Sequence, residues 1–483
     1  MTPTLSPSSI EYNDNTPKMT IICSRVDPAS QNIKNHLQSM REWSVVDVPC
    51  DDFEDLSAVY EHDGMRLVEV ASHHIYQDGI DRKLEECGMP ASILVFASKH
   101  KSGDGRKLLT AHITGNPNTA DFGGNPGELA RAAPYALRSL LMTMRQLAQD
   151  MDYDVSMEST HHGPTDLKVP SVYAEIGSGE GEWNDVHAGE VVARSILGID
   201  CHEVPVALGF GGGHYATRQS ELLFEAGITF GHNFPNYQLE YVDEDLFAQA
   251  VEKSGADFVY LDRRSMSTDD RARIGAMAND RGLLVLREGD IREMKGIGWS
   301  LFKYVFQKAQ QVCPSGRVRF ANGMREYIRE SGFVRSADIS SMKIIRLDEA
   351  LVRQVGSVDR NNLVRSLQSL DVVYIECENG TLSNDLLAFT HQDVEGMLDK
   401  VINECIKILK ERYEIEYIPY ENILCISDSR FSPKLANELG VPHGPMFGEL
   451  AEGHPVVIDG KTISPDMVHE SIRTKLELRN TII

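Results

Sequence analysis

The chain has 483 residues, of which 41% are hydrophobic and 25% are charged. At roughly 150 residues per domain, this length predicts two or three globular units, each large enough to bury a core. Its 48 Lys and Arg residues against 72 Asp and Glu residues give a net charge of −24, which excludes a generally basic nucleic-acid coat protein and a polybasic membrane anchor. There is no run of about 18 apolar residues and no basic leader before an apolar stretch, so we expect a cytoplasmic protein.

Residues 1–18 are rich in Ser, Thr, Pro and Asn without apolar periodicity, and we expect a disordered tail there. From residue 19 to residue 312, short apolar or β-branched runs alternate with amphipathic stretches such as 128–151 and 182–198. The runs predicted to be strands are 20–24, 92–98, 172–177, 204–210, 228–231, 257–261 and 283–286. This alternation predicts an α/β domain at 19–312, with a mostly parallel sheet that carries helices on both faces.

A second unit is predicted at residues 313–483, because the sequence CPSGR interrupts the pattern after an amphipathic stretch. It contains a predicted strand at 372–377, a long predicted helix at 393–413 and a turn-rich terminus. These features indicate an α+β extension, to which the sequence assigns no role.

A basic loop follows the second predicted strand. Ligands of open α/β sheets bind beyond the carboxyl ends of the strands, so the residues after each strand are the first candidates for a site. Lys99, His100, Lys101, Arg106 and Lys107 lie in this loop, which contains a single acidic residue. Such a cluster is typical of a phosphate-facing loop, and equally of a solvated basic turn.

Two adjacent histidines, His161 and His162, form the densest candidate cluster. Imidazoles beside a Gly-Pro turn can act as a base near neutral pH or ligate a divalent metal, although a structural histidine pair is the alternative. Glu175 lies inside an apolar predicted strand, where an unpaired carboxylate is costly to bury, which favours a functional role. Because adjacent residues on an extended backbone point in opposite directions, we expect only one of the two histidines to face the site.

Three consecutive glycines, 211–213, follow the fourth predicted strand and precede His214 and Tyr215. They fit the loose dinucleotide pattern G-x-G-x-x-A, but His232 ends the next strand segment where a ribose-binding Asp or Glu is required, so we reject a dinucleotide cofactor. Glycines at this turn would let the backbone approach a ligand and direct N–H groups into a cleft.

Four motifs, taken in order, resemble those of the archaeal and plant-type D-aminoacyl-tRNA deacylases. They are SRVDPASQNI (24–33), SKHKSGDGRKLLTAHITGN (98–116), HHGPTDLKVPSVYAEIGSGEGEW (161–183) and LGFGGGHYATR (208–218). The resemblance covers residues 19–294 and implies an α/β fold related to peptidyl-tRNA hydrolase and nucleoside phosphorylases. It implies hydrolysis of the ester that joins a D-amino acid, and in some cases glycine, to tRNA, in translation quality control and D-amino acid catabolism. It also implies zinc dependence.

The resemblance and the residues together imply one site. Its catalytic and metal-binding cluster is expected to comprise His161, His162, Glu175 and His214. Its substrate-binding residues are expected to be Lys99, His100, Lys101, Asn116, Thr165, Gly212, Gly213 and Tyr215. A metal-bound or histidine-activated water would attack the ester carbonyl, and the backbone of 212–214 would stabilise the oxyanion. The cysteines form no C-x-x-C, so any Zn²⁺ ligands must come from separated loops, and a metal-free route through the ribose hydroxyl stays open.

The expected partner is tRNA that carries a D-amino acid; no membrane partner is expected, and a monomer is favoured. The end of the chain, residues 439–468, looks like the terminal motif of the tRNA 3′-processing endonuclease Z family. The chain lacks the H-x-H-x-D-H metal motif of that family, so nuclease activity is not implied. Two alternatives stay open: a nucleoside phosphorylase-like enzyme whose basic loop holds phosphate, and a non-catalytic tRNA-binding protein.

Overall fold

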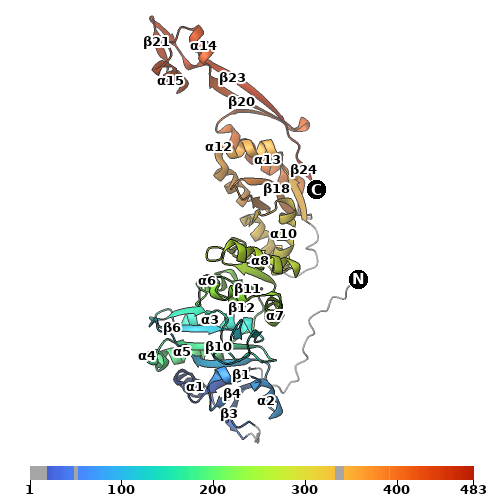
Figure 1. Cartoon of the computed structure of the whole chain (residues 1–483). Helices are drawn as coiled ribbons and strands as arrows, with labels where there is room; N and C mark the ends of the chain where they lie inside the picture. Colours follow the sequence, from blue (N-terminus) through green and yellow to red (C-terminus); the bar gives the residue numbers. More distant parts are fainter. Residues whose placement is uncertain (1–18, 48–52, 332–341, 391) are drawn as a thin grey trace. The chain divides into compact units, whose positions relative to one another are not determined.

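The computed structural model describes residues 19–47, 53–331, 342–390 and 392–483, so the predicted tail at 1–18 lies outside the described residues. The chain divides into two compact units, Met1–Lys295 and Gly296–Ile483, which run from blue to green and from yellow to red in Figure 1. The division comes before the predicted boundary at residue 313. The reason is α10 (Trp299–Val312), whose buried face belongs to the second unit; its Phe302 ring stacks on Phe320 with centroids 6.2 Å apart.

The larger sheet of the first unit has the strand order β2-β3-β4-β1-β5-β10-β6-β9. Its strands are β1 (Met19–Ser24), β2 (Ser44–Val46), β3 (Leu56–His62), β4 (Met65–Val70), β5 (Leu94–Lys99), β6 (Leu108–His112), β9 (Asp154–Met157) and β10 (Ser171–Gly177). The central strands β4, β1, β5 and β10 are parallel, whereas β6 is antiparallel to β10 and parallel to β9. Strands β1 and β10 are buried along their whole length, as central parallel strands covered on both faces must be.

Helices cover this sheet on both faces (Figure 1). On one face, α2 (Ile80–Glu86) packs Ile80 and Leu84 into a core that includes Phe96 and Tyr173. The opposite face is covered by α1 (Pro28–Met40), α3 (Pro134–Leu147), α4 (Glu180–Trp183) and α5 (Val186–Leu197). The predicted layered α/β fold with helices on both faces is therefore confirmed.

Local sequence explains where these helices begin. Proline occupies the first position of both α1 and α3, where its missing N–H group is not needed. Asp27 precedes α1, and its carboxylate accepts a hydrogen bond from the Ser30 N–H at 3.0 Å, which satisfies one of the free donors of the first turn.

The remaining predicted strands form a separate sheet with the order β12-β11-β13-β14, all parallel. Its strands and helices are β11 (Val206–Phe210), β12 (Thr229–Phe234), β13 (Phe258–Leu261), β14 (Leu284–Leu286), α6 (Thr217–Ala226), α7 (Glu244–Ser254), α8 (Thr268–Asp280) and α9 (Glu288–Glu293). The segment after β9 joins the two sheets, because the Thr160 N–H donates to the Asn233 carbonyl of β12 at 2.8 Å. The sequence predicted these strands but not their division between two sheets.

His232 of β12 is a structural histidine. It is fully buried, its Nε2 lies 2.9 Å from the Ala130 carbonyl oxygen, and its Nδ1 lies 3.1 Å from Thr160 Oγ1. A neutral ring satisfies both contacts when Nε2–H donates to the carbonyl and Nδ1 accepts from the hydroxyl. Burial lowers the pKa of His232 from 6.5 to about 4.

This buried histidine makes stability depend on pH. Between its unfolded pKa of 6.5 and its folded pKa of about 4, only the unfolded chain binds the proton, so stability is lost as the pH falls through that window. When the pH is lowered from about 7 to about 5, the free energy of unfolding should fall in both chains. We expect this fall to be about 2 kcal/mol smaller in His232→Gln than in the unaltered chain. Denaturant titrations at the two pH values measure this difference. The exposed His202 gives the control His202→Gln, and a pH dependence equally steep in both variants would contradict the prediction.

The second unit contains the predicted extension. A five-stranded sheet has the order β15-β17-β18-β16-β24, and a three-stranded sheet has the order β19-β20-β23. The strands and long helices are β15 (Arg317–Phe320), β16 (Met342–Arg346), β17 (Val373–Glu376), β18 (Leu382–Phe389), β19 (Glu414–Ile418), β20 (Ile423–Phe431), β23 (His469–Glu477), β24 (Thr481–Ile482), α11 (Asn322–Ser331), α12 (Glu349–Gln368) and α13 (Val394–Lys410). Strand β17 and helix α13 match the elements predicted at 372–377 and 393–413.

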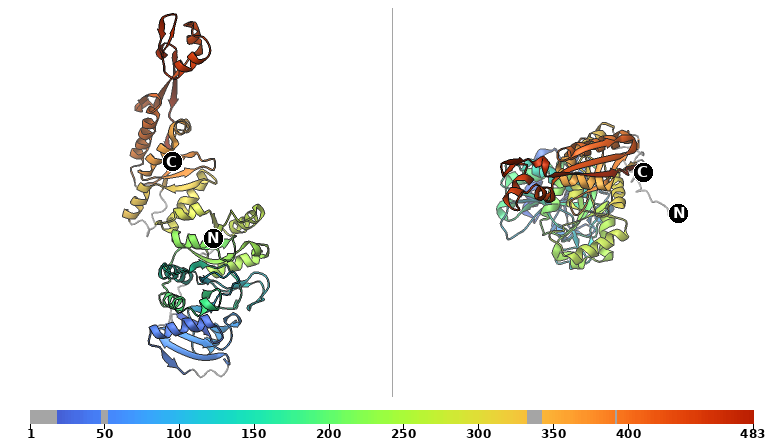
Figure 2. Two further views of the ribbon diagram at one scale, coloured as in Figure 1. Left: turned by 90° about the vertical axis from the view of Figure 1, so that its left-hand side faces the viewer. Right: turned by 90° about the horizontal axis from the view of Figure 1, so that it is seen from above.

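The segment that looks like the endonuclease terminus folds as a small substructure with its own core. The long ribbon of β20 and β23 leads to it, as the left view of Figure 2 shows. It consists of α14 (Pro433–Glu438), α15 (Pro445–Ala451), β21 (Val456–Ile458) and β22 (Lys461–Ile463). Its buried residues include Ala436, Leu450 and Val456. The turn-rich terminus is thus an ordered α+β element.

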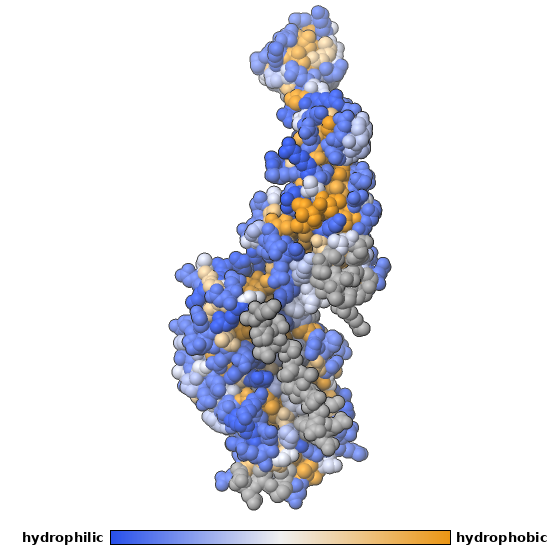
Figure 3. Space-filling view, turned by 90° about the vertical axis from the view of Figure 1, so that its right-hand side faces the viewer, coloured by the Kyte–Doolittle hydropathy of each residue, from blue (hydrophilic) through white to orange (hydrophobic). Residues whose placement is uncertain are grey.

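The surface of the first unit agrees with the polar composition of the chain. In Figure 3, hydrophilic residues cover most of the visible face of the first unit. Among the described residues, no helix combines the length and the apolar character that crossing a membrane requires.

Candidate active site

One cavity of about 770 Å³ gathers most of the candidate residues. The residues that follow β5, β9 and β11 line it together with Glu175 of β10. Its chemically active lining residues are Asp27, His73, His74, Lys99, His100, Lys101, His161, His162, Glu175 and His214. The structure therefore brings together all four residues of the expected catalytic cluster and three of the expected substrate-binding residues.

Both adjacent histidines face this cavity, so the expectation that only one would do so is wrong. The rings of His161 and His162 lie 4.4 Å apart, and both residues line the cavity. His162 has φ +44°, in the left-handed region, so the backbone here is not extended and successive side chains need not alternate. The ring of His161 also lies 4.6 Å from that of His214, so the histidine pair and the glycine turn meet.

His112, the last residue of β6, joins the histidine pair, although the sequence assigns it no catalytic or metal-binding role. Its ring lies 4.3 Å from His161 and 4.8 Å from His162. It is fully buried, and neither of its nitrogens has a hydrogen-bond partner among the described residues. His161 Nδ1 donates to the Ser159 carbonyl at 2.8 Å, and His162 Nδ1 donates to the Gly163 carbonyl at 2.7 Å. In each of these two rings, Nε2 is therefore the unprotonated nitrogen, whose lone pair can bind a metal ion.

These three imidazoles fit a metal ion. One nitrogen from each lies within 4.8 Å of the others. Burial lowers the pKa of His112 to about 3 and that of His162 to about 4, and it holds the pKa of His161 well below the usual value. The rings are therefore neutral at physiological pH, which is the form that binds a metal. A bound metal would also give the buried His112 ring the partner that it lacks among the described residues.

Glu158, directly after β9, is the second residue that sequence reasoning missed. Its side chain is fully buried, Oε2 accepts a hydrogen bond from His214 Nε2 at 2.8 Å, and Oε1 lies 3.1 Å from His100 Nδ1. Burial by itself disfavours the ionised carboxylate, but the hydrogen bonds and charges of the two histidines hold the pKa of Glu158 well below its usual value. Glu158 is therefore a buried anion between two imidazoles.

His100 is the cation that pairs with this anion. Burial lowers the pKa of His100, but the hydrogen bonds and charges of Glu158 and Glu175 more than reverse this effect and raise it to about 11. Its Nε2 lies 3.1 Å from the Tyr215 hydroxyl. A protonated His100 donates that hydrogen bond, which leaves the hydroxyl hydrogen of Tyr215 available for another acceptor.

Glu175 has the ionisation behaviour of a base that works near neutral pH. Its Oε2 lies 3.6 Å from His100 Nδ1. Burial raises the pKa of Glu175, the nearby His100 imidazolium lowers it, and the charge of Glu158 raises it again, to about 7. A carboxyl group with this pKa can exchange a proton with water at physiological pH.

Asn116 and Thr165, two expected substrate-binding residues, do not line the cavity. Asn116 Nδ2 donates to the Gly123 carbonyl at 2.7 Å, and Thr165 Oγ1 donates to Glu128 Oε2 at 2.8 Å. Their polar groups are thus used to hold the loop that precedes α3.

The glycine turn also differs from its expected role. Gly212 and Gly213 do not line the cavity, and the Gly212 N–H donates to Ser265 Oγ at 2.7 Å, so it is not a free donor for an oxyanion. Gly211 and Gly212 have φ values of +97° and +81°, which glycine adopts without strain. The conformation of the turn, rather than a ligand, explains these glycines.

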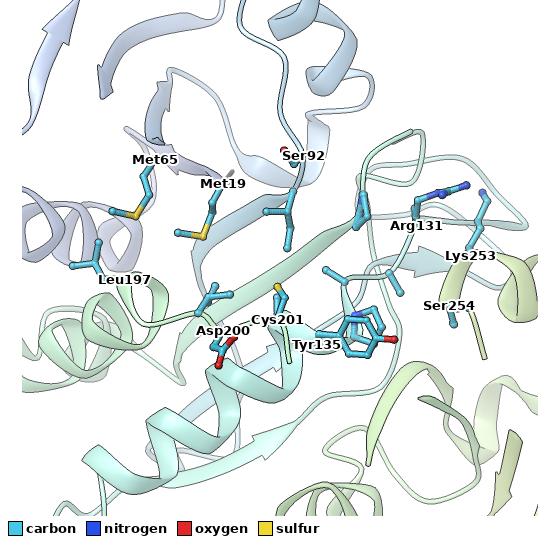
Figure 4. A pocket seen from close by; sticks show the side chains of 18 of the residues that line it. Met19, Met65, Ser92, Arg131, Tyr135, Leu197, Asp200, Cys201, Lys253 and Ser254 are labelled. Carbon is cyan, nitrogen blue, oxygen red and sulfur yellow. The ribbon is translucent and has the colours of Figure 1, made fainter. Parts of the chain in front are cut away.

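A larger cavity of about 870 Å³ lies at the opposite, amino ends of the central strands (Figure 4). Met19, Met65 and Ser92, which begin or precede β1, β4 and β5, line it. Its lining is mostly apolar and includes no histidine from the described part of the chain. Because ligands of parallel sheets bind beyond the carboxyl ends, the histidine cavity is the candidate active site.

A family model and the curated relatives name one family. A family model described as D-aminoacyl-tRNA deacylase matches residues 87–286. A protein with that name from Methanococcoides burtonii is 54% identical over 465 residues, which cover 96% of this chain and 97% of the relative. Another from Methanosarcina mazei is 54% identical over 293 residues, covering 60% of this chain and 98% of the relative. A solved structure, described as a conserved protein of unknown function, is 35% identical with a TM-score of 0.54 and covers 57% of this chain and 96% of its own.

Proposed function

Because the chain belongs to the D-aminoacyl-tRNA deacylase family, we propose that it hydrolyses the ester between a D-amino acid and the terminal ribose of tRNA. The products are the free D-amino acid and tRNA, so the reaction serves quality control in translation. The observation that carries the proposal is the 54% identity to a deacylase over 96% of this chain. The phosphorylase and the non-catalytic alternatives are not favoured by this match.

The cavity supplies groups suited to ester hydrolysis. With a pKa of about 7, Glu175 can accept the proton of the attacking water at its carboxylate. The His100 imidazolium, paired with Glu158, holds the Tyr215 hydroxyl so that its hydrogen can be donated to a substrate oxygen. Lys99 and Lys101 at the cavity add positive charge for the phosphate of the terminal nucleotide.

We infer that a zinc ion binds to His112, His161 and His162. The neutral rings, the carbonyl contacts that fix the Nδ1 protons, and the unpartnered nitrogens of His112 support this assignment. When bound, zinc would act as a Lewis acid on the ester carbonyl. His214 and Glu175, also expected as ligands, lie beside Glu158 and His100, and each belongs to a further group whose ligand atoms lie within 4.8 Å of one another.

The paired assay with D-tyrosyl-tRNA and L-tyrosyl-tRNA tests the proposed activity. A site shaped for one configuration at the α-carbon should release D-tyrosine at least about 100-fold faster than L-tyrosine. The free amino acid is measured over time, with a reaction without protein as the control for spontaneous hydrolysis. Equal rates on both substrates, or release from neither, would contradict the proposal, and phosphate-dependent release of a base from nucleosides would support the phosphorylase alternative.

A further inference from the structure

The histidine cavity is the first of two neighbouring cavities. The second, of about 460 Å³, lies next to it and is distinct from the cavity at the amino ends of the strands. Tyr215 lies between the two: its hydroxyl contacts His100 of the first cavity, and the residue lines the second. The basic loop follows the same path, since residues 99–103 line the first cavity and Arg106 lines the second. A chain-like ligand that follows this loop would therefore pass from one cavity into the other.

Two arginine side chains stacked on aromatic rings line this second cavity. The Arg106 guanidinium lies 4.2 Å from the Tyr215 ring centroid, and that of Arg145 lies 4.3 Å from the Phe224 centroid. Arg145 is exposed, and the Arg106 side chain, which pairs with Asp104 at 2.9 Å, is 46% exposed. Guanidinium planes and aromatic rings are the surfaces on which proteins stack unpaired nucleic-acid bases.

The cavity also offers polar groups for the edge of a base. The Oγ atom of Ser156 is buried and has no hydrogen-bond partner among the described residues, and Ser156 lines the cavity. The exposed carboxylates of Asp154 and Glu221 line it too. A carboxylate accepts a hydrogen bond from the exocyclic amine of cytosine, which uracil lacks.

We propose that this cavity binds the base of the penultimate nucleotide of the substrate, a cytidine in the single-stranded CCA end of tRNA. The terminal adenosine and its D-amino acid then occupy the histidine cavity. The inference rests on the proposed function and adds a subsite to it. It accounts for how a chain with a net charge of −24 holds RNA, because stacking and the guanidinium of Arg145 replace a general basic surface, while Arg106 is paired with Asp104.

Arg145→Ala tests the subsite, with Phe224→Leu as a second variant. Each is assayed with D-tyrosyl-tRNA and with D-tyrosyl-adenosine, which lacks the penultimate nucleotide. We expect KM for the tRNA to rise about tenfold with kcat nearly unchanged, so that kcat/KM for the tRNA falls about tenfold. With D-tyrosyl-adenosine, kcat/KM should stay nearly unchanged. Arg281→Ala is the matched control, because Arg281 stacks on Phe247 at 5.3 Å but lines neither cavity. Equal losses on the two substrates, or no rise in KM for the tRNA, would overturn the subsite.

Direct binding separates this inference from the proposed activity. A fluorescent RNA oligonucleotide ending in CCA should bind the unaltered chain about tenfold more tightly than Arg145→Ala, and an oligonucleotide ending in CUA should bind the unaltered chain several-fold more weakly. If the chain hydrolyses neither substrate but shows these differences, the proposed function fails and the subsite stands. If the deacylase reaction occurs but neither difference is found, the subsite fails alone.

Discussion

Glu158→Gln is expected to lower kcat for D-aminoacyl-tRNA by on the order of 10³-fold, with little change in KM. The substitution keeps the shape of the side chain and removes its charge. Oε2 of Glu158 accepts from His214, and Oε1 lies 3.1 Å from His100 Nδ1, so His214 loses its charged acceptor and His100 loses the nearer of its two carboxylates. Glu175, 3.6 Å from His100 Nδ1, then remains as its only carboxylate partner among the described residues, so the pKa of His100 falls below about 11 and its proton is lost at a lower pH. The Tyr215 hydroxyl is no longer fixed as a donor.

The pH dependence of kcat separates this role from a loss of folding. In the unaltered chain the pKa of His100 is about 11, so its deprotonation does not limit the rate at ordinary pH. In Glu158→Gln the pKa of His100 falls, and kcat should decline as the pH rises through the lowered value.

Glu69→Gln is the matched control, because Glu69 is also a buried glutamate in an ion pair, with Lys34 at 2.5 Å, but lies outside the cavity. Its kcat is expected to stay within about twofold of the unaltered chain, since it touches no group of the site. Comparable losses in the two variants, or a Glu158→Gln variant with nearly unaltered kcat, would contradict a role for Glu158 in positioning His100.

The parallel part of the fold could be predicted from sequence because buried parallel strands are continuous apolar runs. Strands β1, β5 and β10 are such runs, and the rule that ligands lie beyond carboxyl ends leads directly from β5 to Lys99 and His100. The same reasoning finds Glu175, an acid inside the apolar β10. The local sequence pattern does not show which distant segments pair with each other, so the division into two sheets was not predicted.

Two residues of the site to which the sequence assigns no role, His112 and Glu158, lie at the ends of two strands that the sequence did not predict. Strand β9 is only four residues long and alternates polar and apolar positions, and neither β9 nor β6 is among the predicted strands. Both run antiparallel to β10, and His112 pairs with Tyr173 in the middle of that strand. Their carboxyl ends therefore reach the site from the opposite direction, where the rule for parallel strands does not apply. The apolar run before His112 was the available signal for β6.

The histidine pair shows a second limit of sequence reasoning. Alternation of side chains holds only for extended backbone, and His162 has φ +44°. The left-handed residue turns both rings towards His112, with centroids 4.3 Å and 4.8 Å from it. Because His162 adopts this left-handed conformation, both histidines of the pair lie beside His112, and the three imidazoles form one cluster.

His112→Ala is expected to remove zinc from the protein and to lower kcat by on the order of 10³-fold. With His112 replaced, His161 and His162 supply only two imidazoles to the triad, and structural and catalytic zinc sites use at least three protein ligands. The proposed site predicts about one zinc per chain in the unaltered protein, and His161→Ala should lose it as His112→Ala does.

Metal content and thermal stability are the readouts that do not depend on activity. Elemental analysis should find zinc in the unaltered chain and little in His112→Ala, and a chelator should lower Tm of the first but not of the second. His74→Gln is the matched control: His74 is a buried histidine of the same cavity with a pKa lowered by burial to about 4, yet its Nε2 lies 3.4 Å from Ser30 Oγ and it is outside the triad. A His112→Ala chain that retains zinc, or an unaltered chain that neither contains zinc nor gains stability from it, would show that these imidazoles do not form a zinc site.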